Sequence, residues 1–139
     1  MALLTLQTIS KSFGLLPLLD SVSLQIEAGE RLCVVGRNGE GKSTLLKLVE
    51  GTLLPDGGQV IRQQGLRVRR LCQEVPELEG SVEEIVARGL GPLANDWEAH
   101  QAVDRVVSQV GLESGLRFEA LSGGQKRRVL LAQALAGDP

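Results

Sequence analysis

A glycine-rich stretch in the first half of the chain has the residue types that bind phosphate. It fits the spacing G-x-x-x-x-G-K-[ST]. The glycines let the backbone curl closely, so that successive N–H groups point at phosphate oxygens. Lys42 can reach the β- and γ-phosphates of a nucleotide, and the Ser43 hydroxyl can ligate Mg²⁺. The residues expected to bind the nucleotide are Gly36, Arg37, Asn38, Gly39, Glu40, Gly41, Lys42, Ser43 and Thr44.

A chance glycine-rich turn is the alternative explanation for this stretch. At a background glycine usage of about 7%, a match somewhere in the 139 residues has a chance on the order of one percent. The flanking sequence also favours the phosphate site. Residues 31–36 form an apolar run typical of a strand buried on both faces, and residues 42–49 have helical spacing of apolar residues. The amino end of that helix would add its partial positive charge beneath a phosphate.

A second group of residues, Leu121 followed by Ser122, Gly123, Gly124 and Gln125, opens a helical segment. A capping box explains the serine and the glutamine. It does not explain two adjacent glycines, each of which costs up to about 1 kcal/mol of helix stability. Bare N–H groups at a helix start form an anion site. Because two phosphate sites are too many for one triphosphate, a head-to-tail dimer would pair each loop with the partner's serine segment.

The remaining pattern indicates an α/β fold with a small antiparallel β appendage. Alternation or apolar runs predict strands, and spacings of three and four predict helices. Ser81 and Glu84 predict a capping box at one helix start, and Gly111 predicts the end of another helix. Strands are expected at residues 3–9, 21–27, 31–36 and 66–72, and another after a Pro-Asp-Gly turn within residues 53–63; helices are expected at 42–49, 81–90, 97–110 and 121–137.

Composition narrows the class of protein. A chain of 139 residues with 42% hydrophobic and 23% charged residues is an ordinary globular domain, and one domain at most. The net charge of −2 gives no overall basic field for nucleic acid. No apolar run approaches a membrane span and no secretory leader is recognisable, so we expect a cytoplasmic protein without direct membrane insertion. Cys33 and Cys72 are expected to be reduced, mostly buried thiols.

The sequences "GRNGEGKST" and "LSGGQKRR" together resemble the ATP-binding cassette (ABC) ATPases over essentially the whole chain. The resemblance implies a P-loop NTPase of ABC type, with ATP and Mg²⁺ as cofactors. It implies a mixed sheet, an N-terminal antiparallel β subdomain and a helical subdomain. We expect a single incomplete domain, with a nucleotide-binding core (1–73), a helical subdomain (74–120) and a signature helix (121–139).

The same resemblance assigns roles to individual residues. Phe13 resembles the aromatic that stacks on adenine, although plain core packing is the alternative. Gln73 resembles the catalytic glutamine that contacts Mg²⁺, with Ser43 as the other magnesium ligand. The signature residues that would contact the partner's γ-phosphate are Ser122, Gly123, Gly124 and Gln125.

Within the family the chain is most similar to the first cassette of Uup-like ABC-F proteins, soluble tandem cassettes that act on ribosomes. Two features depart from that group. Glu40 stands where a small residue is usual, and it adds negative charge near the phosphates unless it points outward. Residues 90–113 are short for a segment that usually carries a helical arm.

In the family the carboxylates of the Walker B strand follow the segment that here reads "LAGDP". We therefore expect ATP hydrolysis by the complete cassette and little or none by this chain alone. His100 precedes the signature, so it is expected to be a solvent-facing helix residue rather than the family's switch histidine.

The resemblance also suggests partners. A second cassette, in tandem or as a homodimer, is expected. Ribosomal RNA is a further candidate for Arg62, Arg67, Arg69 and Arg70, although a solvated strand face is favoured for them about three to one because the chain is acidic. Two alternatives stay open: the nucleotide-binding subunit of a membrane transporter, and a fragment that binds nucleotide without hydrolysing it.

Overall fold

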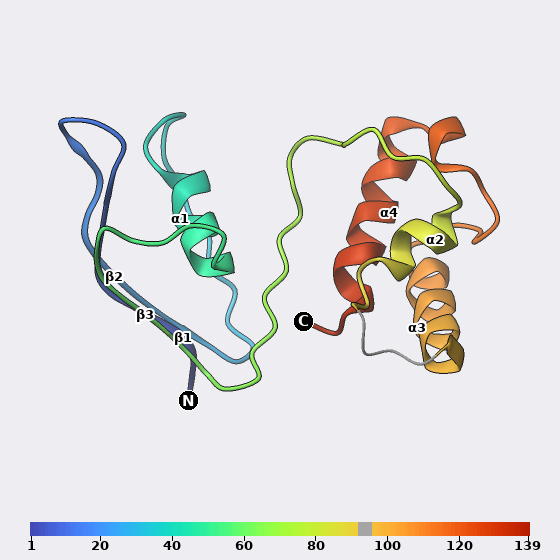
Figure 1. Cartoon of the computed structure of the whole chain (residues 1–139), viewed down its shortest axis with the longest axis horizontal. Coiled ribbons are helices and arrows are strands. Elements are labelled where there is room, and N and C mark those ends of the chain that lie inside the picture. The colour runs from blue at the N-terminus through green and yellow to red at the C-terminus, as the bar shows by residue number, and fades with distance from the viewer. Residues whose placement is uncertain (92–95) are drawn as a thin grey trace. The chain divides into compact units, whose positions relative to one another are not determined.

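The computed structural model describes residues 1–91 and 96–139, except for the side chain of Asp96. The chain divides into two compact units, Met1–Val68 and Arg69–Pro139. Figure 1 shows strands and one helix in the first unit and the remaining helices in the second. Each unit has its own hydrophobic core.

The first unit contains a three-stranded antiparallel sheet. Its strands are β1 (Ala2–Ser12), β2 (Pro17–Glu27) and β3 (Gly57–Arg62). The strand order is β2-β1-β3, so β1 pairs with a neighbour on each side. The strands expected at residues 3–9, at residues 21–27 and after the turn within residues 53–63 are thus confirmed, and the first two are longer than expected and form a hairpin.

The helix α1 (Lys42–Glu50) contributes to the core of this sheet. Leu45 and Leu48 are buried on the helix. They join four buried residues of the two longer strands, Leu4, Leu6, Ile9 and Leu19. Fully burying a leucine or isoleucine side chain contributes about 1.5–3 kcal/mol, so this small cluster is what holds α1 to the sheet.

Arg62 at the end of β3 is tied to the end of α1. Its Nη2 donates to the carbonyl oxygens of Leu48, at 2.8 Å, and Val49, at 3.1 Å. A cation at a helix carboxyl end is favourable because the last carbonyls carry partial negative charge. Arg62 therefore has a structural role in the first unit.

The apolar run at residues 31–36 is not a strand, contrary to expectation, and neither is the segment at residues 66–72. Leu32, Val34 and Val35 are 45%, 43% and 88% exposed. A buried strand needs hydrogen-bonding neighbours and cover on both faces, and no strand in the described part of the chain pairs with these residues. For the same reason the burial expected for Cys33 and Cys72 is wrong: both are free and exposed.

The second unit is built from helices. They are α2 (Val82–Ala87), α3 (Asp96–Gln109) and α4 (Gly123–Ala136), with the short 3₁₀ helix η1 (Phe118–Ala120). The helices expected in this unit are confirmed: α3 is shifted by one residue, and α2 and α4 are shorter than expected. The buried core of this unit consists of Val82, Ile85, Val86, Val103, Val106, Val107, Phe118, Val129, Ala132 and Ala136.

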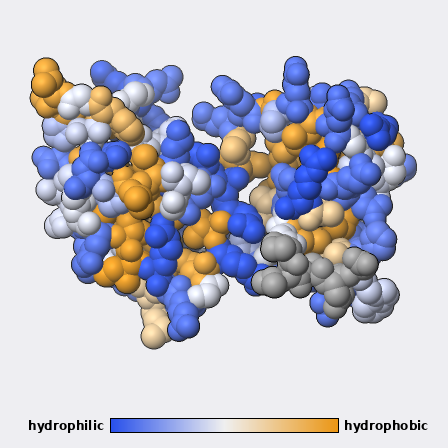
Figure 2. Space-filling view, in the orientation of Figure 1, coloured by the Kyte–Doolittle hydropathy of each residue, from blue (hydrophilic) through white to orange (hydrophobic). Residues whose placement is uncertain are grey.

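Apolar side chains also reach the surface. Figure 2 shows hydrophobic residues among the hydrophilic ones on the viewed face of each unit. Leu15 and Leu16, in the turn between β1 and β2, are fully or largely exposed. None of the helices in the described ranges is long and apolar enough to cross a bilayer.

Candidate nucleotide-binding site

The amino end of α1 is open to an anion. Its capping residue, Gly41, has a left-handed backbone (φ 100°) and makes no side-chain capping hydrogen bond, and the first turn carries no acidic residue. The first amides of a helix lack partners within the helix and attract negative charge. The start of α1 therefore fits a phosphate group.

Close packing requires glycine at the entrance to this helix. A Cβ atom on Gly41 would lie 3.2 Å from both Leu18 Cγ and Leu19 Cδ2, and the φ of 100° would be strained for any other residue. Gly39 also has a positive φ, 85°. Glycine is therefore favoured at positions 39 and 41, because the loop that leads from the exposed run at 31–35 to α1 has a positive φ at both.

Lys42 folds back over the loop that precedes it. Its Nζ donates to the carbonyl oxygen of Gly36 and, at 2.7 Å, to that of Arg37. Lys42 is half-buried, whereas Ser43 beside it in the first helical turn is exposed. The ammonium group is thus held beside the backbone of the loop, and the exposed Ser43 is accessible to a metal ion.

Glu40 turns into the loop rather than outward. Its Oε2 accepts a hydrogen bond from the backbone N–H of Arg37 at 2.6 Å. The backbone N–H of Glu40 in turn donates to Arg37 O at 3.3 Å. The sequence alone did not determine whether this side chain points into the loop or outward. The carboxylate therefore engages one of the backbone N–H groups of the loop that the sequence predicts to bind the nucleotide.

Phe13 lies in the turn between β1 and β2 and is 68% exposed. The alternative that this ring is a core residue is therefore wrong. Lys11 Nζ lies 5.4 Å from the ring centroid, a cation–π distance. An exposed aromatic face is available for stacking, and its contact with adenine stays a prediction.

The signature residues begin α4 in the second unit. Ser122 Oγ accepts from Gln125 N at 3.2 Å, and Gln125 Oε1 accepts from Ser122 N at 3.0 Å, which makes a capping box. This box does not involve the amides of Gly123 and Gly124, and a Cβ on either glycine would meet nothing within 4 Å. The exposed glycine pair is thus open to an approaching ligand, while the serine and the glutamine also cap the start of α4.

Gln73 and His100 both lie in the second unit. Gln73 is an exposed residue outside any helix or strand, and its role at the metal stays a prediction. The side chain of His100 is 72% exposed, and its Nδ1 lies 2.8 Å from Glu83 Oε1. The expectation of a solvent-facing helix residue is confirmed for His100. Across the described ranges no group of three or more His, Cys, Asp or Glu residues could hold a metal ion.

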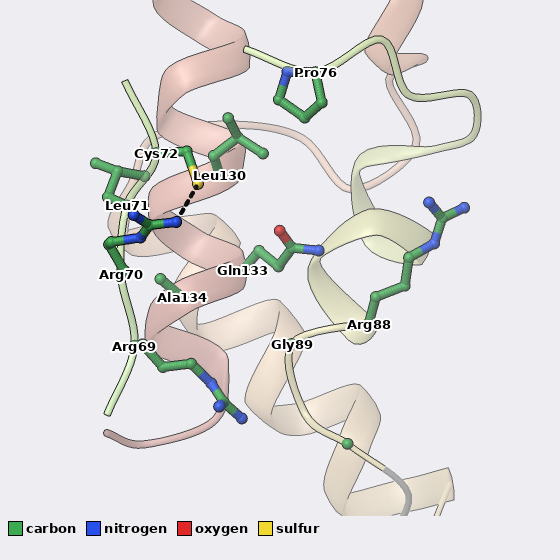
Figure 3. A pocket seen from close by; sticks show the side chains of 11 residues that line it. Arg69, Arg70, Leu71, Cys72, Pro76, Arg88, Gly89, Leu130, Gln133 and Ala134 are labelled. Atoms are coloured by element: carbon green, nitrogen blue, oxygen red, sulfur yellow. Dashed lines mark hydrogen bonds between the residues drawn. The ribbon is translucent and has the colours of Figure 1, made fainter. Parts of the chain in front are cut away.

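The second unit contains a cavity of about 400 Å³ beside α4 (Figure 3). Three arginines line it: Arg69 and Arg70, which the sequence offered as candidates for RNA contact, and Arg88, which it did not single out. Arg70 points toward Cys72, with Nη2 4.0 Å from Sγ, whereas Arg88 donates to Glu79 O at 3.3 Å and points away from Gln133. The guanidinium groups do not converge on one point, so the cavity does not assemble an anion site.

The family follows from comparison with known proteins. The family model described as "ABC transporter" matches residues 19–139. The chain belongs to this family of ATP-binding cassettes.

Curated relatives include two kinds of protein. "ATP-binding protein Uup" of Haemophilus influenzae is 34% identical over all of this chain and 27% of the relative. "Aliphatic sulfonates import ATP-binding protein SsuB 1" of Agrobacterium fabrum is 37% identical over 96% of this chain and 49% of the relative. The chain thus spans about a quarter to a half of the length of these relatives.

Solved structures show the same fold. An ATP-binding cassette of an ABC transporter, at 25% identity, covers the whole chain with a TM-score of 0.81, and the chain covers 66% of that structure. The cbiO1 protein from Clostridium perfringens, at 22% identity, has a TM-score of 0.79 over 99% of this chain and 62% of its own. The expected fold class is thereby confirmed.

Proposed function

We propose that the chain binds ATP with Mg²⁺ through the loop and first helical turn at residues 36–44. The observation that carries the proposal is the uncapped start of α1. Lys42 is held there beside the loop carbonyls and Ser43 is exposed in the first turn. Backbone donors, one cation and one hydroxyl are the groups that a Mg²⁺–triphosphate complex needs. Phe13 would stack on the adenine.

A titration with a fluorescent ATP analogue tests this proposal. We expect saturable binding that Mg²⁺ strengthens and that excess ATP reverses. AMP, which lacks the β- and γ-phosphates, should compete poorly, because the loop recognises phosphates rather than the base. Equal competition by AMP and ATP would contradict a site that recognises the β- and γ-phosphates.

Hydrolysis is proposed for the protein in which this cassette is complete. Gln73 would contact the metal and the attacking water, and the resemblance assigns the Walker B carboxylates to a strand that follows the segment 137–139. For residues 1–139 taken alone we propose binding with little or no turnover. Steady ATP hydrolysis by this chain that disappears in Lys42→Ala would contradict that proposal.

The signature residues are proposed to act on a second cassette in a head-to-tail pair. The exposed glycines Gly123 and Gly124, next to the Ser122 hydroxyl, offer amides at the start of a 14-residue helix. In that arrangement they would close on the γ-phosphate held by the partner's loop. The second cassette would come from a homodimer or from the same longer polypeptide.

For the parent protein we propose a soluble ABC-F ATPase coupled to the ribosome. Its support is the likeness to Uup proteins along the entire chain, at 34% and 33% identity. The segment "VARGLGPL" at residues 86–93, which resembles the Uup-like branch, adds to this, although Pro92 and Leu93 lie outside the described residues. Direct RNA contact through Arg62 is disfavoured, because that side chain caps α1.

A transporter subunit is the second candidate, and a specific observation favours it. The importer ATP-binding proteins SsuB 1 and ZnuC are each 37% identical to this chain, over 96% and 99% of its length. Alignment length does not separate the two candidates, because Uup of Caulobacter vibrioides aligns over 137 positions, against 136 and 139 for the two importer proteins.

Fractionation of the full-length protein in its natural host separates these two candidates. With a non-hydrolysable ATP analogue present, an ABC-F protein should sediment with ribosomes in a sucrose gradient. A transporter subunit should instead be found with the membrane fraction, and ribosome sedimentation unaffected by nucleotide would also count against the first candidate.

A further inference from the structure

We propose that the carboxylate of Glu40 is an internal competitor for the nucleotide's phosphate and thereby sets the affinity of the loop. This inference rests on the proposed ATP binding at residues 36–44. It assigns to Glu40 a role opposite to that of its neighbours in the motif, which bind the ligand.

The geometry places the carboxylate within the loop. Glu40 Oε2 lies 2.6 Å from the backbone nitrogen of Arg37, slightly shorter than the about 2.7–2.9 Å of charge-assisted N–H···O hydrogen bonds. A Cβ atom added to Gly36 would lie only 2.8 Å from the same oxygen. The carboxylate thus lies over the loop backbone, in space that the glycine leaves free.

A carboxylate and a phosphate need the same partner. Both are anionic acceptors, and a backbone N–H group that donates to one is not free for the other. The two negative charges also repel each other at short range. A phosphate that is to use the Arg37 amide must therefore displace Glu40, and the cost of that displacement lowers the observed affinity.

Lys42 also makes hydrogen bonds within the loop. Its Nζ donates to the carbonyl oxygens of Gly36 and Arg37, so the cation is also engaged with the backbone of the loop. Arg37 then has its amide bonded to an internal anion and its carbonyl bonded to an internal cation. The ammonium group has a third N–H donor, so Lys42 can reach a phosphate oxygen while it keeps these contacts, whereas the carboxylate competes directly with the incoming phosphate.

Substitution of Glu40 tests the proposal. We expect Glu40→Ala to tighten the dissociation constant for Mg²⁺–ATP about tenfold, the effect of one charge-assisted hydrogen bond that no longer has to be broken. Glu40→Gln should tighten it less, because the amide oxygen still accepts from Arg37 N–H. Inorganic pyrophosphate should show the same order of affinities, and binding of adenosine should not change.

Glu30 provides the matched control. Its Oε2 accepts from the backbone N–H of Glu27 at 2.9 Å, the same separation of three residues as in the loop. Glu30 lies outside the phosphate motif, so Glu30→Ala removes an equal charge and a similar contact without changing ATP affinity. A gain of affinity in both alanine variants would overturn the proposal, because it would show a general charge effect.

Lys42→Ala separates failure of this inference from failure of the proposed function. If Lys42→Ala weakens ATP binding while Glu40→Ala leaves it unchanged or weaker, ATP binding at the loop stands and the role of Glu40 is overturned. If neither the natural chain nor Glu40→Ala binds ATP or pyrophosphate, both proposals fail. Binding by Glu40→Ala that exceeds that of the natural chain supports both.

Discussion

Lys42 Nζ lies 2.7 Å from the carbonyl oxygen of Arg37, so the lysine of the phosphate loop is bonded to the backbone of its own loop. This contact fixes the position of the Lys42 ammonium group beside the loop backbone in the absence of a ligand. A charged donor held in place loses less conformational entropy on binding than a free side chain does. The loop is therefore preorganised for phosphate by the residue that would bind it.

Gly89, which follows α2, has no room for a side chain. A Cβ atom there would lie 2.9 Å from Gln133 C and would come still closer to Gln133 O on α4. We expect Gly89→Ala to lower the free energy of unfolding by about 1–3 kcal/mol, because the two backbones would have to separate. Urea unfolding followed by circular dichroism measures the change. Gly115→Ala is the control, since a Cβ there would meet nothing within 4 Å, and equal losses in the two variants would contradict the packing argument.

Ser122 stabilises the start of α4 through its capping box. Ser122→Ala should lower the free energy of unfolding by about 1 kcal/mol, because the amide of Gln125 loses its partner. Ser108→Ala, at an exposed position inside α3, should cause no loss and is the control. Thermal unfolding of the two variants and of the natural chain gives the comparison. An unchanged melting temperature in Ser122→Ala would mean that the box contributes nothing.

Asp56 gives the first unit a pH-dependent contribution to stability. A hydrogen bond from Lys11 Nζ, at 2.8 Å, and one from the backbone N–H of Ser12, at 2.9 Å, hold the pKa of Asp56 below its ordinary value of 3.8. A lowered pKa in the folded state means that the stabilisation is present above that ordinary value. It is lost as the pH falls through the lowered pKa.

Asp56→Asn should remove this dependence. Urea midpoints measured from neutral pH down to about pH 2.5 should fall less steeply for the variant than for the natural chain at the acid end. Asp20→Asn alters a carboxylate that takes no part in the hydrogen bonds of Asp56, so this variant should retain the pH profile of the natural chain. Parallel curves for the natural chain and Asp56→Asn would contradict the assignment.

The elements that local pattern determines were predictable. Alternation of apolar residues gave the strands β1 and β2, and apolar spacing gave α1 and α3. Capping boxes at Ser81 and Ser122 could be predicted because each depends on four consecutive residues. These features need no distant partner, so the sequence around them is sufficient.

Features that depend on distant partners were not predictable. Residues 31–36 have the composition of a buried strand, yet Val35 is 88% exposed because no described strand pairs with this run. The burial assigned to Cys33 failed with it. At the candidate site, glycine spacing located the loop. The inward direction of Glu40 depends on one hydrogen bond to Arg37, which the spacing does not determine.

Binding of Mg²⁺–ATP to Lys42→Ala, beside Lys47→Ala, tests the central claim most directly. Lys47 lies in the last turn of the same helix and is exposed, so its loss removes an equal charge at the opposite end of α1. Isothermal titration should show at least about a tenfold loss of affinity for Lys42→Ala, as expected for a hydrogen bond to a charged group, and none for Lys47→Ala. Equal affinities in the natural chain and both variants would contradict the assignment of residues 36–44 as the nucleotide site.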